Sequence, residues 1–244
     1  MIPEAILRIL PSVQPLVFET DITDCPYSTG GSLFLVGYKG RAFVLTARHA
    51  HSPENCSPIC VFPTDTSQRV LPLKNYFFVS SSDVPDDFAD FVAIEIDMAK
   101  INDTEVGEAQ LINLDLALGD WLSKADIAEM YVVGYPNEYS CVDYQQEALA
   151  NHRLTLCGRY VGASESDHLH VLEVFDTNNL ETFSGFSGGP VFAWIVHPGN
   201  RGEIVFCGMT LRGTPASRRF HFLDRSLLLH GMEIFSNKLS RKIL

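Results

Sequence analysis

The chain has 244 residues, of which 46% are hydrophobic and 20% are charged, and its formal net charge at pH 7 is −12. A chain of this length can bury a core without disulfides or metals, either as one large all-β unit or as two small domains. The acidic balance argues against nucleic acid and against an anionic membrane surface as partners, because both need a basic face on the protein.

The first ten residues do not have the pattern of a targeting segment. Glu4 and Arg8 interrupt the apolar positions and Pro11 follows them, whereas a secretory signal needs a basic start and an unbroken apolar run. No stretch of the sequence is long and apolar enough to cross a bilayer. We therefore expect a cytoplasmic protein.

Short apolar runs, separated by turn residues, follow one another along most of the chain. Residues 37–40 (GYKG) predict a hairpin turn between the first two runs. The predicted strands are residues 32–36, 42–46, 75–80, 91–96, 131–133, 154–158, 170–174, 191–195 and 204–209. This series favours β-barrels over a fold that alternates strands with helices.

The last segment has a different periodicity. Apolar residues from Leu227 to Leu239 recur with helical spacing, and Asp224 or Ser226 is a candidate N-cap. The sequence therefore predicts a C-terminal helix.

The sequence contains six cysteines, at positions 25, 56, 60, 141, 157 and 207. We expect these to be the reduced thiols of a cytoplasmic protein. Cys56, Cys60 and the nearby His51 are a candidate metal clip, but a CxxxC pair with one histidine lacks the paired spacing of a zinc site. The sequence therefore predicts no bound metal and no other cofactor.

Three separated segments carry the residue types of an acyl-transfer triad. His49 follows the predicted strand 42–46, Asp90 directly precedes the predicted strand 91–96, and Ser187 lies in the sequence GFSGGP. Serine becomes a nucleophile at neutral pH when a histidine takes its proton, and a carboxylate fixes the tautomer of that histidine. Asp90 lies 41 positions after His49 and Ser187 lies 97 positions after Asp90, close to the gaps of about 45 and about 93 in the template triad.

These segments resemble those of the chymotrypsin-like (trypsin-like) serine peptidase family, especially its disulfide-free bacterial branch. Residues 44–49 (VLTARH) are similar to the strand end that carries the catalytic histidine, residues 90–96 to the segment that begins with the aspartate, and residues 185–190 to the nucleophile loop. Residues 132–136 (VVGYP) resemble a strand-turn that opens the second half of bacterial members. The likeness extends over residues 30–213.

The resemblance implies an all-β fold of two six-stranded antiparallel β-barrels, followed by a C-terminal helix packed on the second barrel. Residues 1–118 would form the first barrel half, which carries His49 and Asp90. Residues 119–244 would form the second half, which carries Ser187 and the helix. The site would lie in the groove between the two halves.

The same resemblance implies a serine endopeptidase that hydrolyses a protein or peptide substrate through an acyl-enzyme. Ser187 would be the nucleophile, His49 the general base and Asp90 the residue that orients His49. The backbone N–H groups of Gly185 and Ser187 would form the oxyanion hole, since a glycine can turn its N–H inward without a Cβ clash. Disulfide-free relatives further suggest a regulated bacterial stress or defence effector.

The resemblance also indicates which residues contact the substrate. Glu181 falls where the family has the floor of its primary pocket, and Leu211, Arg212 and Gly213 fall on the strand that pairs with the substrate. A carboxylate at position 181 favours cleavage after Lys or Arg. Arg212 at the wall would oppose a basic side chain or pair with Glu181 instead, so the expected preference is slight.

Other residues compete for the catalytic roles. His51 lies two positions after His49, but the Thr-Ala-x-His pattern selects His49, and the aspartates at 86–87 lie in a predicted loop. His168 and His170 are expected to be ordinary surface groups on one face of a strand.

Position 186 departs from the family. Most secreted members have an acidic residue directly before the serine, which pairs with a new N-terminus after activation cleavage, whereas this chain has Phe186. The resemblance therefore suggests no zymogen switch of that kind. Two alternatives remain open: the oxyanion loop is set in the native fold, or a protein partner or ligand orders it.

Two other functions are compatible with parts of the sequence. Residues 185–189 also match the GxSxG elbow of α/β hydrolases, but only 57 residues follow Ser187, too few for the elements that come after that elbow. The second is a catalytically inactive protease fold that binds peptides by adding a strand in its groove. The sequence favours the active peptidase over both.

Overall fold

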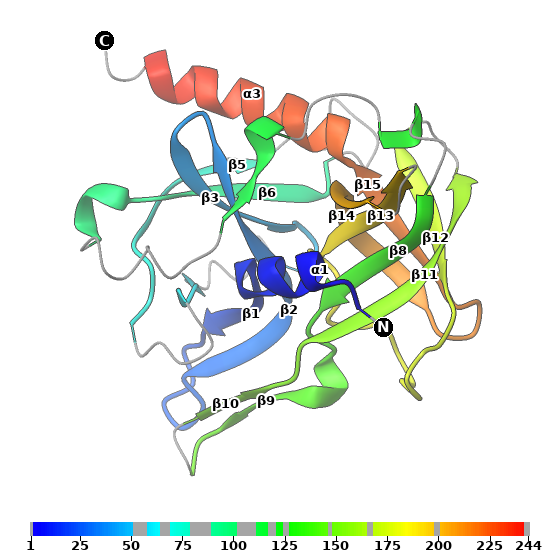
Figure 1. The fold of residues 1–244 in the computed structure, drawn as a ribbon. Coiled ribbons are helices and arrows are strands. Elements are labelled where there is room, and N and C mark those ends of the chain that lie inside the picture. The colour runs from blue at the N-terminus through cyan, green and yellow to red at the C-terminus, as the bar shows by residue number, and fades with distance from the viewer. Residues whose placement is uncertain are drawn as a thin grey trace.

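The computed structural model describes residues 2–50, 58–63, 69–78, 89–101, 111–116, 121–123, 127–145, 148–164, 168–197 and 201–241. A helix lies near each end of this part of the chain, α1 (Glu4–Ile9) and α3 (Arg225–Arg241), and most other regular structure is β (Figure 1). The short 3₁₀ helices are η1 (Leu10–Ser12), η3 (Met98–Lys100), η4 (Leu114–Leu116), η5 (Trp121–Ser123) and η6 (Asn137–Tyr139). The predicted all-β fold with a C-terminal helix is confirmed. None of the described helices is long and apolar enough to cross a membrane.

Seven strands from the first half of the chain form one sheet. They are β1 (Val13–Glu19), β2 (Tyr27–Tyr38), β3 (Arg41–Ala47), β4 (Ile59–Cys60), β5 (Leu73–Phe78), β6 (Phe91–Ile96) and β7 (Ile112–Asn113). Six pair antiparallel in the order β4-β1-β2-β3-β6-β5, and β7 pairs parallel with β2. The backbone N–H of Leu71, before β5, donates to Val61, after β4 (2.6 Å). The described strands form a half-barrel sheet, which matches the first half of the predicted two-barrel fold.

The second half forms the closed six-stranded antiparallel barrel that the sequence predicted. Its strands are β8 (Ile127–Gly134), β11 (Leu154–Ala163), β12 (Leu169–Val174), β13 (Pro190–His197), β14 (Arg201–Thr214) and β15 (Arg219–Asp224), in the order β11-β12-β15-β14-β13-β8. A separate hairpin consists of β9 (Ser140–Asp143) and β10 (Ala148–Asn151). The predicted boundary at residue 118 lies outside the described residues and stays a prediction.

The hairpin β2–β3 fixes where the chain reaches the site. Its two-residue loop, Lys39 and Gly40, has φ values of 48° and 71°, as the type I′ turn of a tight hairpin requires. The register pairs Tyr38 with Arg41 and Leu33 with Thr46. The far end of β3 therefore lies beside the start of the apolar part of β2.

One apolar core joins the two halves and the C-terminal helix. Phe43 and Phe77 of the first half share it with Phe206 of the second half and Phe235 of α3. The Phe235 ring centroid lies 5.6 Å from that of Phe43 and 5.1 Å from that of Phe77. Because α3 also contacts β14 and β15, it packs on the second barrel, as expected, and on the first half as well (Figure 1).

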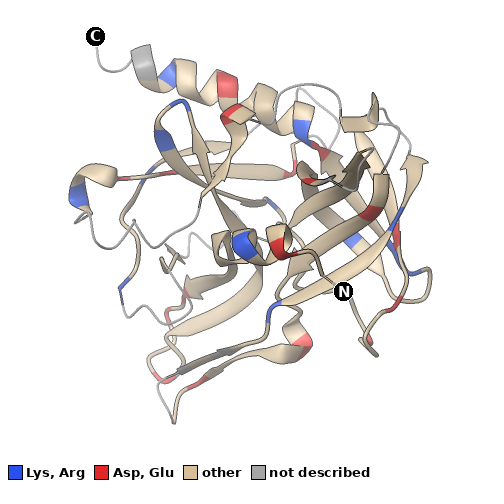
Figure 2. Cartoon of the chain, viewed as in Figure 1, with Lys and Arg blue, Asp and Glu red and all other residues tan. Residues whose placement is uncertain are grey.

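Charged side chains of both signs are interspersed over both halves (Figure 2). Arg159 lies 3.2 Å from Glu173 on the second barrel, and Lys100 lies 3.2 Å from Asp97 on the first sheet. Exposed pairs of this kind each contribute about 0–1 kcal/mol to stability. Each of these two ion pairs lies within one half, whereas the apolar core contains residues of both halves and joins them.

The second barrel contains a buried cluster of polar side chains, His170, Trp121 and Asp224. His170, which is only 1% exposed, lies between the rings of Trp121 and Phe222, each with its centroid 5.5 Å away. The expectation that His170 is a surface group was wrong, because both faces of β12 are covered. Trp121 Nε1 donates to Asp224 Oδ2 (2.6 Å) and His170 Nε2 lies 3.5 Å from the same oxygen.

Asp224 also begins the C-terminal helix, as one of the two predicted caps. Its Oδ1 accepts a hydrogen bond from the backbone N–H of Ser226 (2.7 Å). Burial alone would raise the pKa of Asp224, but the hydrogen bonds from His170, Ser226 and Trp121 outweigh burial and lower the pKa from 3.8 to about 2.

We expect Asp224→Asn to reduce the free energy of unfolding more at pH 7 than at pH 3. Because the folded-state pKa is lowered, the ionised carboxylate stabilises the fold above pH 4, and this stabilisation is lost as the pH falls from 3.8 towards 2. The pKa difference corresponds to about 2 kcal/mol. Urea unfolding at the two pH values measures it, with the exposed Asp24→Asn as control. A loss that is equal at both pH values would contradict the assignment.

Candidate active site

The antiparallel pairing of β3 with β6 brings two of the predicted triad residues together. Ala47, at the end of β3, pairs with Phe91, at the start of β6, so the residues just beyond each end meet. Asp90 accepts two hydrogen bonds from His49: Oδ1 from the backbone N–H (2.8 Å) and Oδ2 from Nδ1 (2.6 Å). The carboxylate thus holds both the main chain and the ring of His49.

This pairing also decides the chemistry of the imidazole. An ionised carboxylate only accepts hydrogen bonds, so Nδ1 carries the proton and Nε2 is left with its lone pair. The His49 side chain is 48% exposed, whereas that of Asp90 is 18% exposed. Nε2 can therefore take a proton from a group on the solvent side.

Ser187 lies on a tight turn, residues 185–189, directly before β13. Gly185 and Gly188 have φ values of 98° and 85°, a left-handed conformation that glycine adopts without strain. A Cβ at Gly185 would lie 2.2 Å from the carbonyl oxygen of Tyr135, and one at Gly188 would lie 2.5 Å from Thr46 Oγ1. Both glycines are needed because the turn packs directly on its neighbours.

Phe186 anchors this turn in the core of the second barrel. The residue has no exposed surface, and its ring centroid lies 5.3 Å from that of Phe220 and 6.0 Å from that of Phe183. The position that is acidic in secreted members of the family the sequence resembles therefore holds an apolar anchor. It cannot form the ion pair of a zymogen switch.

The Ser187 turn is docked on the first half, next to the chain that carries His49. The carbonyl oxygen of Ser187 accepts a hydrogen bond from the backbone N–H of Ser32 on β2 (2.9 Å). A Cβ at Gly31 would lie 3.1 Å from both the Ser187 oxygen and the Cβ of Ala50. Ser187 and the residue after His49 thus face one another across Gly31.

The Ser187 hydroxyl itself donates to the carbonyl oxygen of Leu211 (2.6 Å). Among the described side chains, His49 and Ser187 form no hydrogen bond with each other in this conformation. The structure therefore joins His49 with Asp90 and brings Ser187 to the same junction, while the hydroxyl is bonded elsewhere. Catalytic hydrogen bonds are often loose or absent without substrate.

Two backbone N–H groups of the turn have no acceptor among the described residues, and they are those of Gly185 and Ser187, the pair expected for an oxyanion hole. The three other N–H groups are used: Phe186 donates to Phe183 (3.2 Å), Gly188 to Thr210 (2.8 Å) and Gly189 to Phe186 (2.9 Å). The turn can therefore offer two N–H donors, from residues two positions apart, to a negatively charged oxygen.

The predicted substrate residues lie in different environments. Glu181 and Arg212 are exposed, Gly213 is half-buried and Leu211 is fully buried. Phe183, which no sequence motif singled out as a substrate residue, stacks its ring on that of Phe220 with centroids 4.1 Å apart and an angle of 14°. A Cβ at Gly213 would lie 3.0 Å from the Phe183 ring. This aromatic pair fills the space between the turn and β14.

The candidate metal clip lies partly outside the described residues, as do His51, Cys56 and the aspartates at 86–87. Cys60 is buried, and its Sγ lies 3.7 Å from Glu19 Oε1. Burial and the nearby Glu19 raise the pKa of the Cys60 thiol to about 11, which disfavours the thiolate that metals bind. The described part of the chain contains no cluster of three or more metal-binding side chains, and its cysteines are free thiols.

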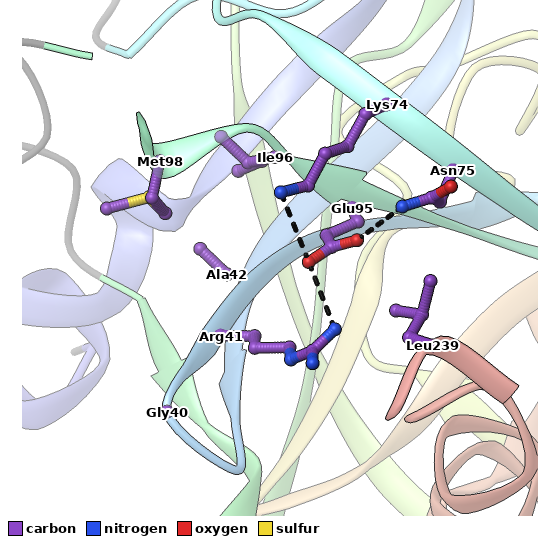
Figure 3. Close-up of a pocket in the computed structure, with 9 residues that line it drawn as sticks. All are labelled: Gly40, Arg41, Ala42, Lys74, Asn75, Glu95, Ile96, Met98 and Leu239. Atoms are coloured by element: carbon purple, nitrogen blue, oxygen red, sulfur yellow. Dashed lines mark hydrogen bonds and ion pairs between the residues drawn. The ribbon is translucent and has the colours of Figure 1, made fainter. Parts of the chain in front are cut away.

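A cavity of about 470 Å³ lies at the opposite end of β3 and β6 from His49, near Arg41 and Ile96 (Figure 3). Its buried carboxylate, Glu95, is paired with Arg41 (3.3 Å), Lys74 (3.5 Å) and Asn75 (2.8 Å). These pairs satisfy its main polar groups internally. Because the cavity lies at the other end of β3 and β6, it is separate from His49 and Asp90.

No protein-family model matches the sequence, and no curated protein matches it. Among solved structures, the chain is similar to AL20, a thermostable serine protease from an extremophilic microorganism, with a TM-score of 0.56 and 12% identity over 91% of this chain and 94% of that chain. The fold is chymotrypsin-like. A Glu endopeptidase in complex with MPD is similar with a TM-score of 0.48 and 13% identity, over 88% of this chain and 84% of that chain. The sequence resemblance is thus confirmed for the chymotrypsin-like fold.

We expect Phe186→Ala to destabilise this chymotrypsin-like fold by about 3–5 kcal/mol, because it removes a fully buried aromatic ring and leaves a cavity. Urea unfolding at pH 7 measures the loss. Phe175, which is 54% exposed, provides the matched control, and Phe175→Ala should change stability by less than about 1 kcal/mol. Equal losses in the two variants would contradict the anchoring role of Phe186.

Proposed function

We propose that the chain is a serine endopeptidase that uses Ser187 as nucleophile, His49 as general base and Asp90 as the residue that orients His49. The observation that carries this proposal is the Asp90–His49 pair, with Nδ1 2.6 Å from Oδ2, at the junction where the Ser187 turn docks. The pair leaves Nε2 able to accept a proton, and the turn offers two N–H donors. These are the parts that acyl transfer needs.

In the proposed reaction, the Ser187 hydroxyl turns from Leu211 towards Nε2 of His49, gives it the proton and attacks the carbonyl carbon of the substrate. The electron pair of the carbonyl moves to its oxygen, which binds to the N–H groups of Gly185 and Ser187. Each such donor contributes about 3 kcal/mol to transition-state stabilisation in comparable sites. His49 then protonates the leaving amine, and water, activated in the same way, releases the acyl group from Ser187.

The substrate would bind as an added strand along β14. β13 pairs with β14 as far as Met209, and beyond this point β14 pairs with β15 on its other side. An extended peptide along residues 211–213 would bring a carbonyl group to the Ser187 turn. We propose that Leu211 and Gly213 line this path, with the exposed Arg212 at its rim.

The Phe183–Phe220 stack determines the proposed specificity. It occupies the space beside Gly213 where the side chain before the scissile bond would enter, so we propose that a small residue is preferred there. This replaces the slight preference for a basic residue, for which an exposed Glu181 provides no buried counter-charge.

We expect the parent to cleave peptides with Ala before the scissile bond faster than matched peptides with Phe or Lys. Phe183→Ala should raise kcat/KM for the Phe peptide relative to the Ala peptide by about tenfold or more, since one large group in an apolar pocket changes discrimination by that order. Phe192→Ala, which removes an equally buried ring elsewhere in the barrel, is the control. A parent enzyme that cleaves all three peptides equally would contradict the proposal.

A second candidate function is a peptide-binding module that has the protease fold without activity. The observation that favours it is the hydrogen bond from Ser187 Oγ to Leu211 (2.6 Å), which keeps the hydroxyl away from His49. In such a module the same β14 edge would bind a peptide without cleaving it.

Covalent labelling distinguishes the two candidates. We expect the purified chain to react with a fluorophosphonate at Ser187, and Ser187→Ala to abolish the label. Asp90→Asn should lower kcat by about 10⁴-fold, as loss of the orienting carboxylate does in the template triad. An unlabelled chain that still binds peptides would support the module.

The setting of this activity is also a proposal. A cytoplasmic location is proposed from the cysteine usage, and a role as a regulated bacterial stress or defence effector is proposed from the sequence resemblance. In that setting the substrate would be a protein or a peptide. No nucleic acid, membrane or cofactor takes part in the proposed reaction.

A further inference from the structure

The direction of the Gly185 N–H group is fixed by a hydrogen bond to the carbonyl group of the same peptide. In a trans peptide the N–H and the C=O point in opposite directions, so the acceptor end fixes the donor end. The carbonyl oxygen of Ser184, which belongs to the same peptide as the N–H of Gly185, accepts a hydrogen bond from the backbone N–H of Asn137 (2.9 Å). The Gly185 N–H must then point away from Asn137.

The next two peptides of the turn are held in the same way. The carbonyl oxygen of Phe186, which shares a peptide with the N–H of Ser187, accepts from Gly189 (2.9 Å). Between these peptides, the carbonyl oxygen of Gly185 accepts from the side-chain hydroxyl of Ser32 (2.6 Å). All three peptides between positions 184 and 187 therefore have an internal partner at the carbonyl end.

Ser32 is the residue that ties the turn to the other half of the molecule. It lies on β2 of the first half, has no exposed surface and is 153 positions from Gly185. Its hydroxyl donates to Gly185 and accepts from the backbone N–H of Tyr135 (2.9 Å), while its own N–H donates to Ser187 (2.9 Å). One buried serine thus holds the peptide between the two donor peptides, through the carbonyl of Gly185, and the peptide that follows Ser187, through the carbonyl of Ser187.

The surroundings leave this hydroxyl little freedom. A Cβ at Gly134 would lie 2.9 Å from Ser32 Oγ, and the carbonyl oxygen of Ser32 accepts from Thr46 Oγ1 (2.8 Å). Ser32→Ala would remove the hydrogen bonds that Ser32 Oγ forms with the carbonyl of Gly185 and with the backbone N–H of Tyr135, and the buried Gly185 carbonyl would lose its donor. An unsatisfied buried group is costly enough to turn a peptide towards another partner.

We propose that Ser32 is a positioning residue that sets the oxyanion turn in the folded chain, so that the turn needs neither activation cleavage nor a protein partner. The inference rests on the proposed peptidase function. Of the two alternatives that the sequence leaves open, it selects the turn that is set in the native fold. Phe186 contributes by fixing the middle of the turn in the barrel core.

The first test compares Ser32→Ala with the parent, both as purified full chains with nothing added. We expect the parent to be active as purified, and Ser32→Ala to lose about tenfold to a hundredfold in kcat with KM nearly unchanged, since small misplacements of catalytic groups cost that much. A peptide aldehyde forms an oxyanion-like adduct, so its inhibition constant should rise by a similar factor. Ser32→Thr keeps a hydroxyl at the position and should restore part of the loss.

Ser12 provides the matched control. It is 1% exposed and its hydroxyl also donates to a backbone carbonyl, that of Ile9 (2.5 Å), but it does not contact the turn. Ser12→Ala should lower stability without changing kcat or the aldehyde constant. Equal kinetic losses in Ser12→Ala and Ser32→Ala would show a general structural effect and overturn the inference.

A second pair of variants tests the same idea if Ser32→Ala does not fold. Asn137 is the first residue of η6, and the preceding Pro136 is extended, with φ −61° and ψ 137°, so a proline fits at position 137. Asn137→Pro removes the N–H that holds Ser184, whereas Asn137→Ala keeps it. We expect the proline variant to lose about tenfold more kcat than the alanine variant.

The outcomes separate this inference from the proposed function. A parent that is labelled at Ser187 while Ser32→Ala and Asn137→Pro keep its kcat would overturn the inference alone. So would a parent that is labelled only after limited proteolysis or after a partner is added. A parent that no fluorophosphonate labels under any of these conditions would remove the proposed function and this inference with it.

Discussion

The docking of the Ser187 turn on strand β2 is the contact on which the proposed site depends. His49 and Asp90 belong to the first half and Ser187 to the second, so their relative positions are only as fixed as the junction between the halves. Ser32 takes part in three hydrogen bonds across this junction: it donates to Gly185 and Ser187 and accepts from the backbone N–H of Tyr135. A catalytic constellation must be held within a fraction of an ångström, which a buried, fully bonded serine can do.

The shared core and α3 make the same junction rigid on a larger scale. Phe235 of α3 packs on two aromatic rings of the first half, although the helix follows the second barrel in the chain. Removal of this apolar surface from water stabilises the arrangement of the two halves. His49 and Asp90 of the proposed site, by contrast, lie where β3 ends and β6 begins.

The sequence predicted the features that depend on local pattern. The hairpin at residues 37–40 and the C-terminal helix follow from turn chemistry and periodicity, whereas the closed second barrel was expected from the resemblance to the chymotrypsin-like family. The pairing of His49 with Asp90 was expected from the residue types, order and spacing of a triad and from the family resemblance. The buried His170 and the aromatic filling around Phe183 were not predictable, because they depend on which residues from distant segments share one cavity. The role of Ser32 has no local sequence signal either, since the hydrogen bonds of its hydroxyl group are to residues more than 100 positions away in the chain.

A structure of the purified chain with a peptide aldehyde would test the central claim most directly. The account predicts a covalent bond from Ser187 Oγ to the aldehyde carbon, with the resulting oxygen within hydrogen-bond distance of the N–H groups of Gly185 and Ser187. It also predicts that the hydroxyl leaves Leu211 and that Nε2 of His49 lies next to Oγ. A peptide bound along β14 without that bond, and with the Ser187 hydroxyl still on Leu211, would contradict the account.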